Sequence, residues 1–170
     1  GFPDLMTQLP QFTVTHQTGE SDHARVAEAY RRVGIESQIV PFIYDMPAAL
    51  RQADLVVARA GAMTVAELTA CGKPAILVPL PSAIYDHQTH NAKVMEAAGA
   101  AVLLPQSKLT GALLARTVTG ILGDRDRLRA MGEASLSLRR IDAAEVIVRE
   151  CYALMGGRHD VHRSVGAAGN

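Results

Sequence analysis

The residues best suited to binding chemistry lie between positions 53 and 67, where an apolar run leads into a glycine-containing turn. Residues 55–58 are predicted to form a strand, and Gly61 follows in the turn. A helix is expected to begin at Thr64, with Glu67 one turn inside it. Glycine lets a ligand approach the backbone closely, and the amides of a first helical turn attract negative charge. The segment therefore predicts an anion site beside a carboxylate.

Glu67 has two interpretations. Thr64 and Glu67 have the spacing of a capping box, in which the threonine caps the helix and the glutamate reaches back to it. Alternatively, the Glu67 carboxylate accepts hydrogen bonds from two adjacent sugar hydroxyls, beside a phosphate held by the amides of the turn. The spacing alone leaves both interpretations open.

A second polar group follows Pro79 and Pro81, where a fourth strand ends. Its residues suit neutral, hydroxyl-rich ligands such as sugars, and they are Asp86, Gln88 and Asn91. The plain alternative is that Asp86 caps a helix and that the two amides are solvated. His87 and His90 have a spacing that can bind a metal, but no third ligand is near them in the sequence, so no metal site is predicted.

Two further segments follow the first two predicted strands. His16 and Thr18 can contact a phosphate or can simply turn the chain. Phe42 and Ile43 stand where the second strand ends, and an aromatic ring there can pack on a base or belong to the core. The same alternatives hold for Tyr44 and Tyr85.

Strands and helices are expected to alternate along the chain. The predicted strands are residues 12–16, 37–42, 55–58, 75–79 and 101–104. The predicted helices are residues 23–33, a short one from 45, 64–71, 87–98, 110–122, 124–138 and 142–155. Repeated strand–helix units indicate an α/β fold with a parallel sheet and helices on both faces. Ligands of such sheets bind at the carboxyl ends of the strands, where every candidate group above lies.

Composition excludes several classes of protein. The chain has 170 residues, with 17 Lys and Arg against 17 Asp and Glu, so no broad attraction to nucleic acid or to a membrane surface is expected. The two cysteines, Cys71 and Cys151, are too far apart for a metal motif and favour a reducing cytoplasm.

Residues 1–155 are expected to form one domain that begins partway through a strand–helix unit, and residues 156–170 are expected to form a flexible tail.

Several segments together resemble the C-terminal domain of glycosyltransferase family 28, the family of the N-acetylglucosamine transferases of peptidoglycan synthesis. They are residues 16–19, 41–46, 53–67, 72–79 and 86–92, continued by 97–101 and 109–110. The resemblance covers residues 8–150. It implies a Rossmann-like half of a GT-B enzyme that binds UDP-GlcNAc, needs no metal or other cofactor, and works with an N-terminal domain that receives lipid I at the membrane.

The resemblance also implies roles for single residues. Glu67 would bind the ribose hydroxyls, Ile43 the uracil edge through its backbone, and Phe42 the uracil ring. The turn residues expected at the diphosphate are Gly61, Ala62, Met63 and Thr64, with His16 and Thr18 as further possible contacts. The residues expected at the GlcNAc hydroxyls are Gln88 and Asn91, and Asp86 is a further residue expected to bind UDP-GlcNAc.

The chain also departs from the family pattern. The opening strand of the family domain and its Gly-Gly-Ser loop are missing, as are the acceptor-binding domain and the catalytic base placed there, so no catalytic residue is assigned in this chain. Thr89 stands where the family often has a second amide. The expected location of the full enzyme is the cytoplasm, peripheral on the inner face of the membrane. Two alternatives stay open, a non-catalytic UDP-sugar-binding subunit and a GT-B enzyme with another acceptor.

Overall fold

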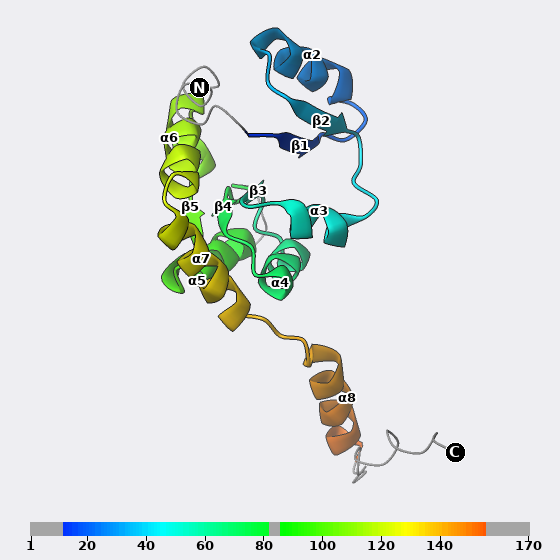
Figure 1. Ribbon diagram of the computed structural model, residues 1–170. Coiled ribbons are helices and arrows are strands. Elements are labelled where there is room, and N and C mark those ends of the chain that lie inside the picture. Colours follow the sequence, from blue (N-terminus) through cyan, green and yellow to red (C-terminus); the bar gives the residue numbers. More distant parts are fainter. Residues whose placement is uncertain (1–11, 82–85, 156–170) are drawn as a thin grey trace, which may run out of the picture. The chain divides into compact units, whose positions relative to one another are not determined.

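The computed structural model describes residues 12–81 and 86–155 (Figure 1). Its strands are β1 (Val14–Gln17), β2 (Ser37–Val40), β3 (Val56–Ala58), β4 (Ala75–Leu77) and β5 (Ala101–Leu103). Its helices are α2 (His23–Val33), α3 (Met46–Gln52), α4 (Ala62–Cys71), α5 (His87–Ala97), the 3₁₀ turn η2 (Gln106–Lys108), α6 (Gly111–Leu122), α7 (Arg125–Ser137) and α8 (Ala143–Leu154). The alternation of strands and helices is confirmed.

The described strands are all parallel, as predicted, but they pair in two sheets instead of one. Strand β1 pairs with β2, and β4 lies between β3 and β5 in the second sheet. Single strands were predictable because short apolar or β-branched runs bounded by turn residues mark them. Which strands become neighbours depends on hydrogen bonds between distant residues, which a local pattern does not report.

Strand β4 is buried on both faces, as its unbroken apolar run predicted. Ala75 and Leu77 belong to one core cluster, which includes residues of α4 and α5. Ile76 and Val78 belong to a second cluster, to which α6 and α7 contribute. Helices therefore cover both faces of this three-stranded sheet, and the sheet positions the carboxyl ends of β3, β4 and β5 at one edge.

The helix ends follow the local chemistry of the sequence. Gly34 and Gly72 close α2 and α4 in the left-handed conformation, with φ of 67° and 62°. The carboxylates of Asp45 and Asp124 and the hydroxyl of Thr110 accept hydrogen bonds from the first turns of α3, α7 and α6. Each such cap contributes about 1 kcal/mol to helix stability.

Residues 140–155, the described part of the chain beyond Arg139, belong to a second compact unit. Its helix α8 has no buried residue, and Ile147, Val148 and Leu154 are exposed apolar side chains on it. The expectations for residues 1–10, for Tyr85 and for the tail 156–170 fall outside the described residues. Within the described ranges, no helix has the length and hydropathy needed to cross a membrane.

Candidate functional site

The turn between β3 and α4 presents the start of a helix at the carboxyl end of the sheet. Gly61 is the N-cap residue, and the first hydrogen bond of the helix runs from the Val65 amide to the Gly61 carbonyl at 3.0 Å. The amides of Ala62, Met63 and Thr64 precede that bond and so have no partner within the helix. Met63 is 76% exposed. The turn therefore offers three adjacent backbone donors at the positive end of a helix dipole.

Gly61 is required neither by its backbone conformation nor by its neighbours. Its φ of −62° is one that any residue adopts. A Cβ built on it meets the Thr64 hydroxyl at 3.8 Å, which is an ordinary van der Waals distance. The missing side chain thus leaves room beside the amides of the turn, as a closely approaching ligand requires.

The capping-box interpretation of Glu67 is wrong. Helix α4 begins at Ala62, two residues earlier than predicted, so Thr64 is the third helical residue instead of the cap. Glu67 then lies one turn further along and three positions from Thr64, which places both side chains on one face of the helix. Both are half-buried. The Glu67 carboxylate is thus not used to close its own helix.

Two amide side chains on the first turns of α5 contact the neighbouring strand ends. The Leu80 amide donates to Gln88 Oε1 at 3.0 Å, and Asn91 Nδ2 donates to the Ala60 carbonyl at 3.0 Å. The interpretation of these amides as merely solvated is therefore wrong. The structure brings Asn91 to the Ala60 carbonyl, next to Gly61, and brings Gln88 to the segment that follows β4.

Asp86 stands at the start of α5, but its side chain makes no capping hydrogen bond. The interpretation of Asp86 as a helix cap is therefore wrong. Its backbone is left-handed, with φ of 55°, and it is the one non-glycine residue with positive φ among residues 12–81 and 86–155. Such a conformation costs about 1 kcal/mol or more and is concentrated at ligand-binding segments.

His16 and Thr18 lie at the carboxyl end of β1. His16 Nδ1 is 3.2 Å from the Tyr30 hydroxyl, and their rings meet edge to face with centroids 5.7 Å apart. Partial burial lowers the pKa of His16 below its usual value. His16 is therefore neutral near pH 7 and can offer a phosphate a hydrogen bond but no full positive charge. The Thr18 hydroxyl donates to the Gly19 carbonyl at 2.8 Å, and this bond stabilises the turn after β1.

Phe42 and Ile43 lie just beyond the end of β2. Phe42 is 56% exposed and packs edge to face against Tyr44, which is 92% exposed. The interpretation of these two rings as core residues is therefore wrong. The Ile43 amide donates to Gln17 Oε1 at 2.9 Å. A nucleobase that accepted a hydrogen bond from this amide would therefore have to displace the Gln17 side chain.

Sequence reasoning missed Arg59 and Gln106. Arg59 Nη1 donates to the carbonyls of Val78 and Pro79 at 3.1 and 3.3 Å and to Gln106 Oε1 at 2.8 Å. These contacts join the ends of β3 and β4 to the turn η2 after β5. The available signal was an arginine directly after an apolar strand, at the edge where ligands bind.

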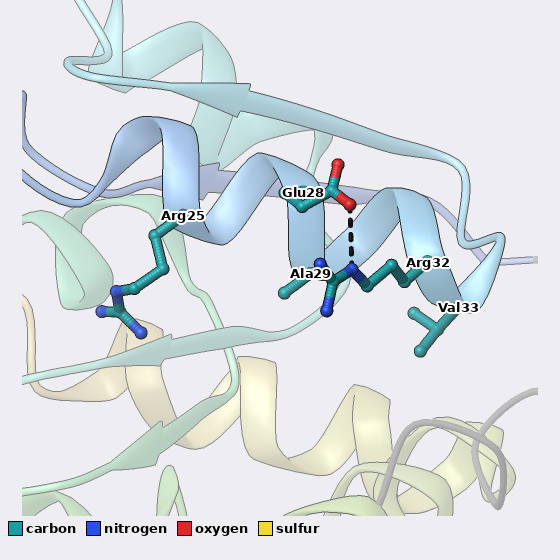
Figure 2. Close-up of a pocket in the computed structure, with 5 residues that line it drawn as sticks. All are labelled: Arg25, Glu28, Ala29, Arg32 and Val33. Atoms are coloured by element: carbon teal, nitrogen blue, oxygen red, sulfur yellow. Dashed lines mark hydrogen bonds and ion pairs between the residues drawn. The ribbon is translucent and has the colours of Figure 1, made fainter.

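A surface pocket on α2 lies away from every predicted site residue. Figure 2 shows its lining, which comes from α2 alone: Arg25, Glu28, Ala29, Arg32 and Val33. Arg31 and Arg32 bond to the Glu28 carboxylate at 2.8 Å and lower its pKa. A pocket lined by one helix, with its carboxylate already paired, does not make a binding site for a nucleotide or sugar.

Metal ligands are not clustered in the parts of the chain that the structure describes. No group of three or more His, Cys, Asp or Glu side chains there is placed to hold a metal ion. His87 and His90 accordingly have no further metal ligand among those residues.

The sequence of residues 2–147 matches the model of the glycosyltransferase family 28 C-terminal domain. The chain belongs to this family. N-acetylglucosamine transferases from several bacteria are similar in sequence to this chain. The UDP-N-acetylglucosamine–N-acetylmuramyl-(pentapeptide) pyrophosphoryl-undecaprenol N-acetylglucosamine transferase of Geobacter metallireducens is 46% identical over 148 residues, which are 87% of this chain and 41% of the relative. The same enzyme of Alkalilimnicola ehrlichii is 49% identical over 152 residues, 88% and 43% of the two chains.

Solved structures agree with this family membership. The crystal structure of Acinetobacter baumannii MurG is 34% identical, with a TM-score of 0.79 over 88% of this chain and 44% of that one. The glycosyltransferase VinC, solved in complex with dTDP, has a TM-score of 0.65 at 19% identity and shows the shared GT-B fold. The chain spans less than half the length of these relatives.

Proposed function

We propose that this family 28 chain binds UDP-GlcNAc as the donor half of a transferase that delivers GlcNAc to lipid I, forming lipid II. Relatives at 42–49% identity carry the name of that N-acetylglucosamine transferase, which supports the donor and the acceptor. The observation that carries the proposal is the start of α4. Three backbone amides there have no partner within the helix, and the Glu67 carboxylate lies on the next turn. Gly61 precedes them, although neither its backbone conformation nor its neighbours require a glycine.

Each part of this arrangement suits one part of the donor. The amides of Ala62, Met63 and Thr64 would bind the diphosphate, whose charge the helix dipole favours. The Glu67 carboxylate would accept hydrogen bonds from both ribose hydroxyls, since an anion beside bound phosphate is tolerated only where it faces donors.

The remaining contacts come from the other strand ends. The exposed ring of Phe42 offers a face to uracil, and the backbone of Ile43 would meet the uracil edge in place of Gln17. Gln88 Nε2 and Asn91 Oδ1, the amide atoms opposite those bonded to Leu80 and Ala60, would meet the GlcNAc hydroxyls. Asp86 would accept from the same sugar, and His16 and Thr18 would reach the diphosphate.

In the complete reaction an acceptor hydroxyl attacks the anomeric carbon of GlcNAc in line. The bond from that carbon to the diphosphate oxygen breaks, the acceptor proton passes to a base, and UDP leaves with the bonding pair. The start of α4 would stabilise the charge that develops on the leaving diphosphate. Acceptor binding, the base and peripheral contact with the inner face of the membrane are assigned to the portion of the relatives that this chain does not cover.

Calorimetry with UDP and 2′-deoxy-UDP tests the ribose role of Glu67. The native chain is expected to bind UDP more tightly than the deoxy ligand, because the carboxylate loses one hydroxyl partner. Glu67→Ala is expected to weaken UDP binding by about 1–3 kcal/mol, the range of a charge-assisted hydrogen-bond pair. The preference for UDP over 2′-deoxy-UDP should disappear in the variant.

Glu133→Ala is the matched control, since Glu133 is an exposed glutamate on α7. It is expected to keep both the affinity and the discrimination of the native chain. A Glu67→Ala variant that still prefers UDP to the deoxy ligand would show that Glu67 does not bind the ribose. Failure of the native chain to bind any UDP ligand would refute the donor-site proposal as a whole.

A further inference from the structure

We propose that Arg59 and Asn91 are positioning residues that hold the turn at Ala60 and Gly61 from two sides. They fix the turn's amides for the ligand without depending on contact with it. The effect on ligand binding rests on the proposed function above, whereas the effect on the turn itself does not. Both residues act through backbone carbonyls at the ends of β3 and β4.

On the side of β4, Arg59 joins three segments through one nitrogen. Its Nη1 lies 3.1 and 3.3 Å from the carbonyls of Val78 and Pro79 and 2.8 Å from Gln106 Oε1. The side chain starts in the β3–α4 turn, so these bonds tie the turn to its neighbours. Val78 is 7% exposed, and a hydrogen bond at such a buried strand end is stronger than one in water.

On the side of α5, Asn91 Nδ2 donates to the Ala60 carbonyl at 3.0 Å. Ala60 is fully buried, so loss of this donor would remove a partner that water cannot easily replace. One turn earlier on α5, Gln88 Oε1 accepts from the Leu80 amide at 3.0 Å. Asn91 and Gln88 thus connect the same helix to the β3 end and to the β4 end.

These contacts close a ring. On one side, Arg59, the neighbour of Ala60, bonds to the Pro79 carbonyl, and the next residue, Leu80, bonds to Gln88 of α5. On the other side, Asn91 of the same helix bonds back to Ala60. The turn that begins α4 is part of this ring. A ligand that binds its amides then meets donors already in place, so less ordering is required on binding.

The ring makes a prediction that a sugar contact alone does not. If Asn91 only accepted from GlcNAc, Asn91→Asp would keep that acceptor, and UDP, which lacks the GlcNAc group, would bind as before. If Asn91 donates to Ala60, the carboxylate of Asn91→Asp instead faces a carbonyl oxygen. Asn91→Asp and Asn91→Ala are therefore both expected to weaken binding of UDP itself by about tenfold, as measured by calorimetry.

Hydrogen exchange of the ligand-free chain gives a readout that is independent of binding. Asn91→Asp and Arg59→Met are each expected to speed the exchange of the first protected amides of α4. Arg59→Lys should retain part of the protection, because its ammonium also has several donors but a shorter reach. The double variant of Arg59→Met and Asn91→Ala is expected to weaken UDP binding by less than the product of the single effects, because both break one ring.

Arg129→Met is the matched control, because Arg129 is an exposed arginine that pairs with Asp126 three residues away on α7. It should change neither exchange nor affinity. If Arg59→Met does not fold, Arg59→Lys and Gln106→Ala decide the question through the same exchange measurement. Unchanged hydrogen exchange of the α4 amides in these variants and in Asn91→Asp would overturn the proposal. A loss of affinity for UDP-GlcNAc with unchanged affinity for UDP would overturn it as well. A native chain that does not bind UDP would refute the donor site, while exchange would still test the ring.

Discussion

At the scale of single residues, Gly61 and Gly72 show that glycines can have opposite roles at the two ends of one helix. Gly72 closes α4 with φ of 62°, and a Cβ there would lie 2.5 Å from the Leu136 side chain. Gly61 begins α4 with an ordinary φ and has room for a Cβ. The structure of the chain itself requires glycine at position 72 and does not require it at position 61.

Gly61→Ala is therefore expected to separate stability from binding. The free energy of unfolding, measured in urea, should change by less than about 1 kcal/mol, the difference between glycine and alanine as N-caps. UDP affinity should fall at least about tenfold, because the new methyl group occupies the space beside the phosphate-binding amides.

Gly72→Ala is the contrasting control, with a large loss of stability from its backbone strain and the contact with Leu136. An unchanged UDP affinity in Gly61→Ala would show that no ligand approaches the turn at this position.

At the scale of elements, the packing of β1 on α2 is sensitive to pH through His16. Burial lowers the pKa of this histidine from its ordinary value of 6.5, so the unfolded chain binds a proton more readily than the folded chain does. Stability from this source is present above pH 6.5 and is lost as the pH falls through the folded-state pKa. The free energy of unfolding should accordingly decrease between pH 7 and pH 5.

His16→Asn removes the titrating group while keeping a polar atom near the Tyr30 hydroxyl. Its urea denaturation is expected to depend less on pH over that interval than that of the native chain. Equal pH dependence in both proteins would assign the effect to other groups.

Element boundaries were predictable where a local signal sets them. Gly34 and Gly72 ended their helices as expected, and the apolar run of β4 correctly indicated burial on both faces. The prediction for the start of α4 is wrong by two residues because Thr64 has the side chain of a typical N-cap. Gly61 is the actual N-cap, and it has no side chain by which the sequence could mark it.

Contacts between distant segments were beyond local reasoning. Asn91 lies 31 positions from Ala60, and Arg59 lies 47 positions from Gln106, so no periodic pattern connects them. The sequence placed the candidate residues at the carboxyl ends of strands but did not show which of them bond to each other. That choice arises from the pairing of β3, β4 and β5.

At the scale of the whole molecule, the two core clusters lie within residues 1–139. One includes Leu68, Leu77 and Met95, and the other includes Ile76 and Ile121. All candidate site residues also belong to this unit. The turn at Gly61 and both core clusters therefore belong to one compact unit.

A chain that ends at Arg139 is therefore expected to keep both its stability and its UDP affinity. Both core clusters and all candidate site residues remain in the shortened chain. Thermal unfolding of the shortened chain should show the same main transition within about 2 °C, where a loss of 1 kcal/mol would shift it by about 4 °C. A fall of many degrees, or a loss of UDP binding in calorimetry, would show that the second unit stabilises the first. Equal values would show that residues 1–139 suffice for the fold and the donor site.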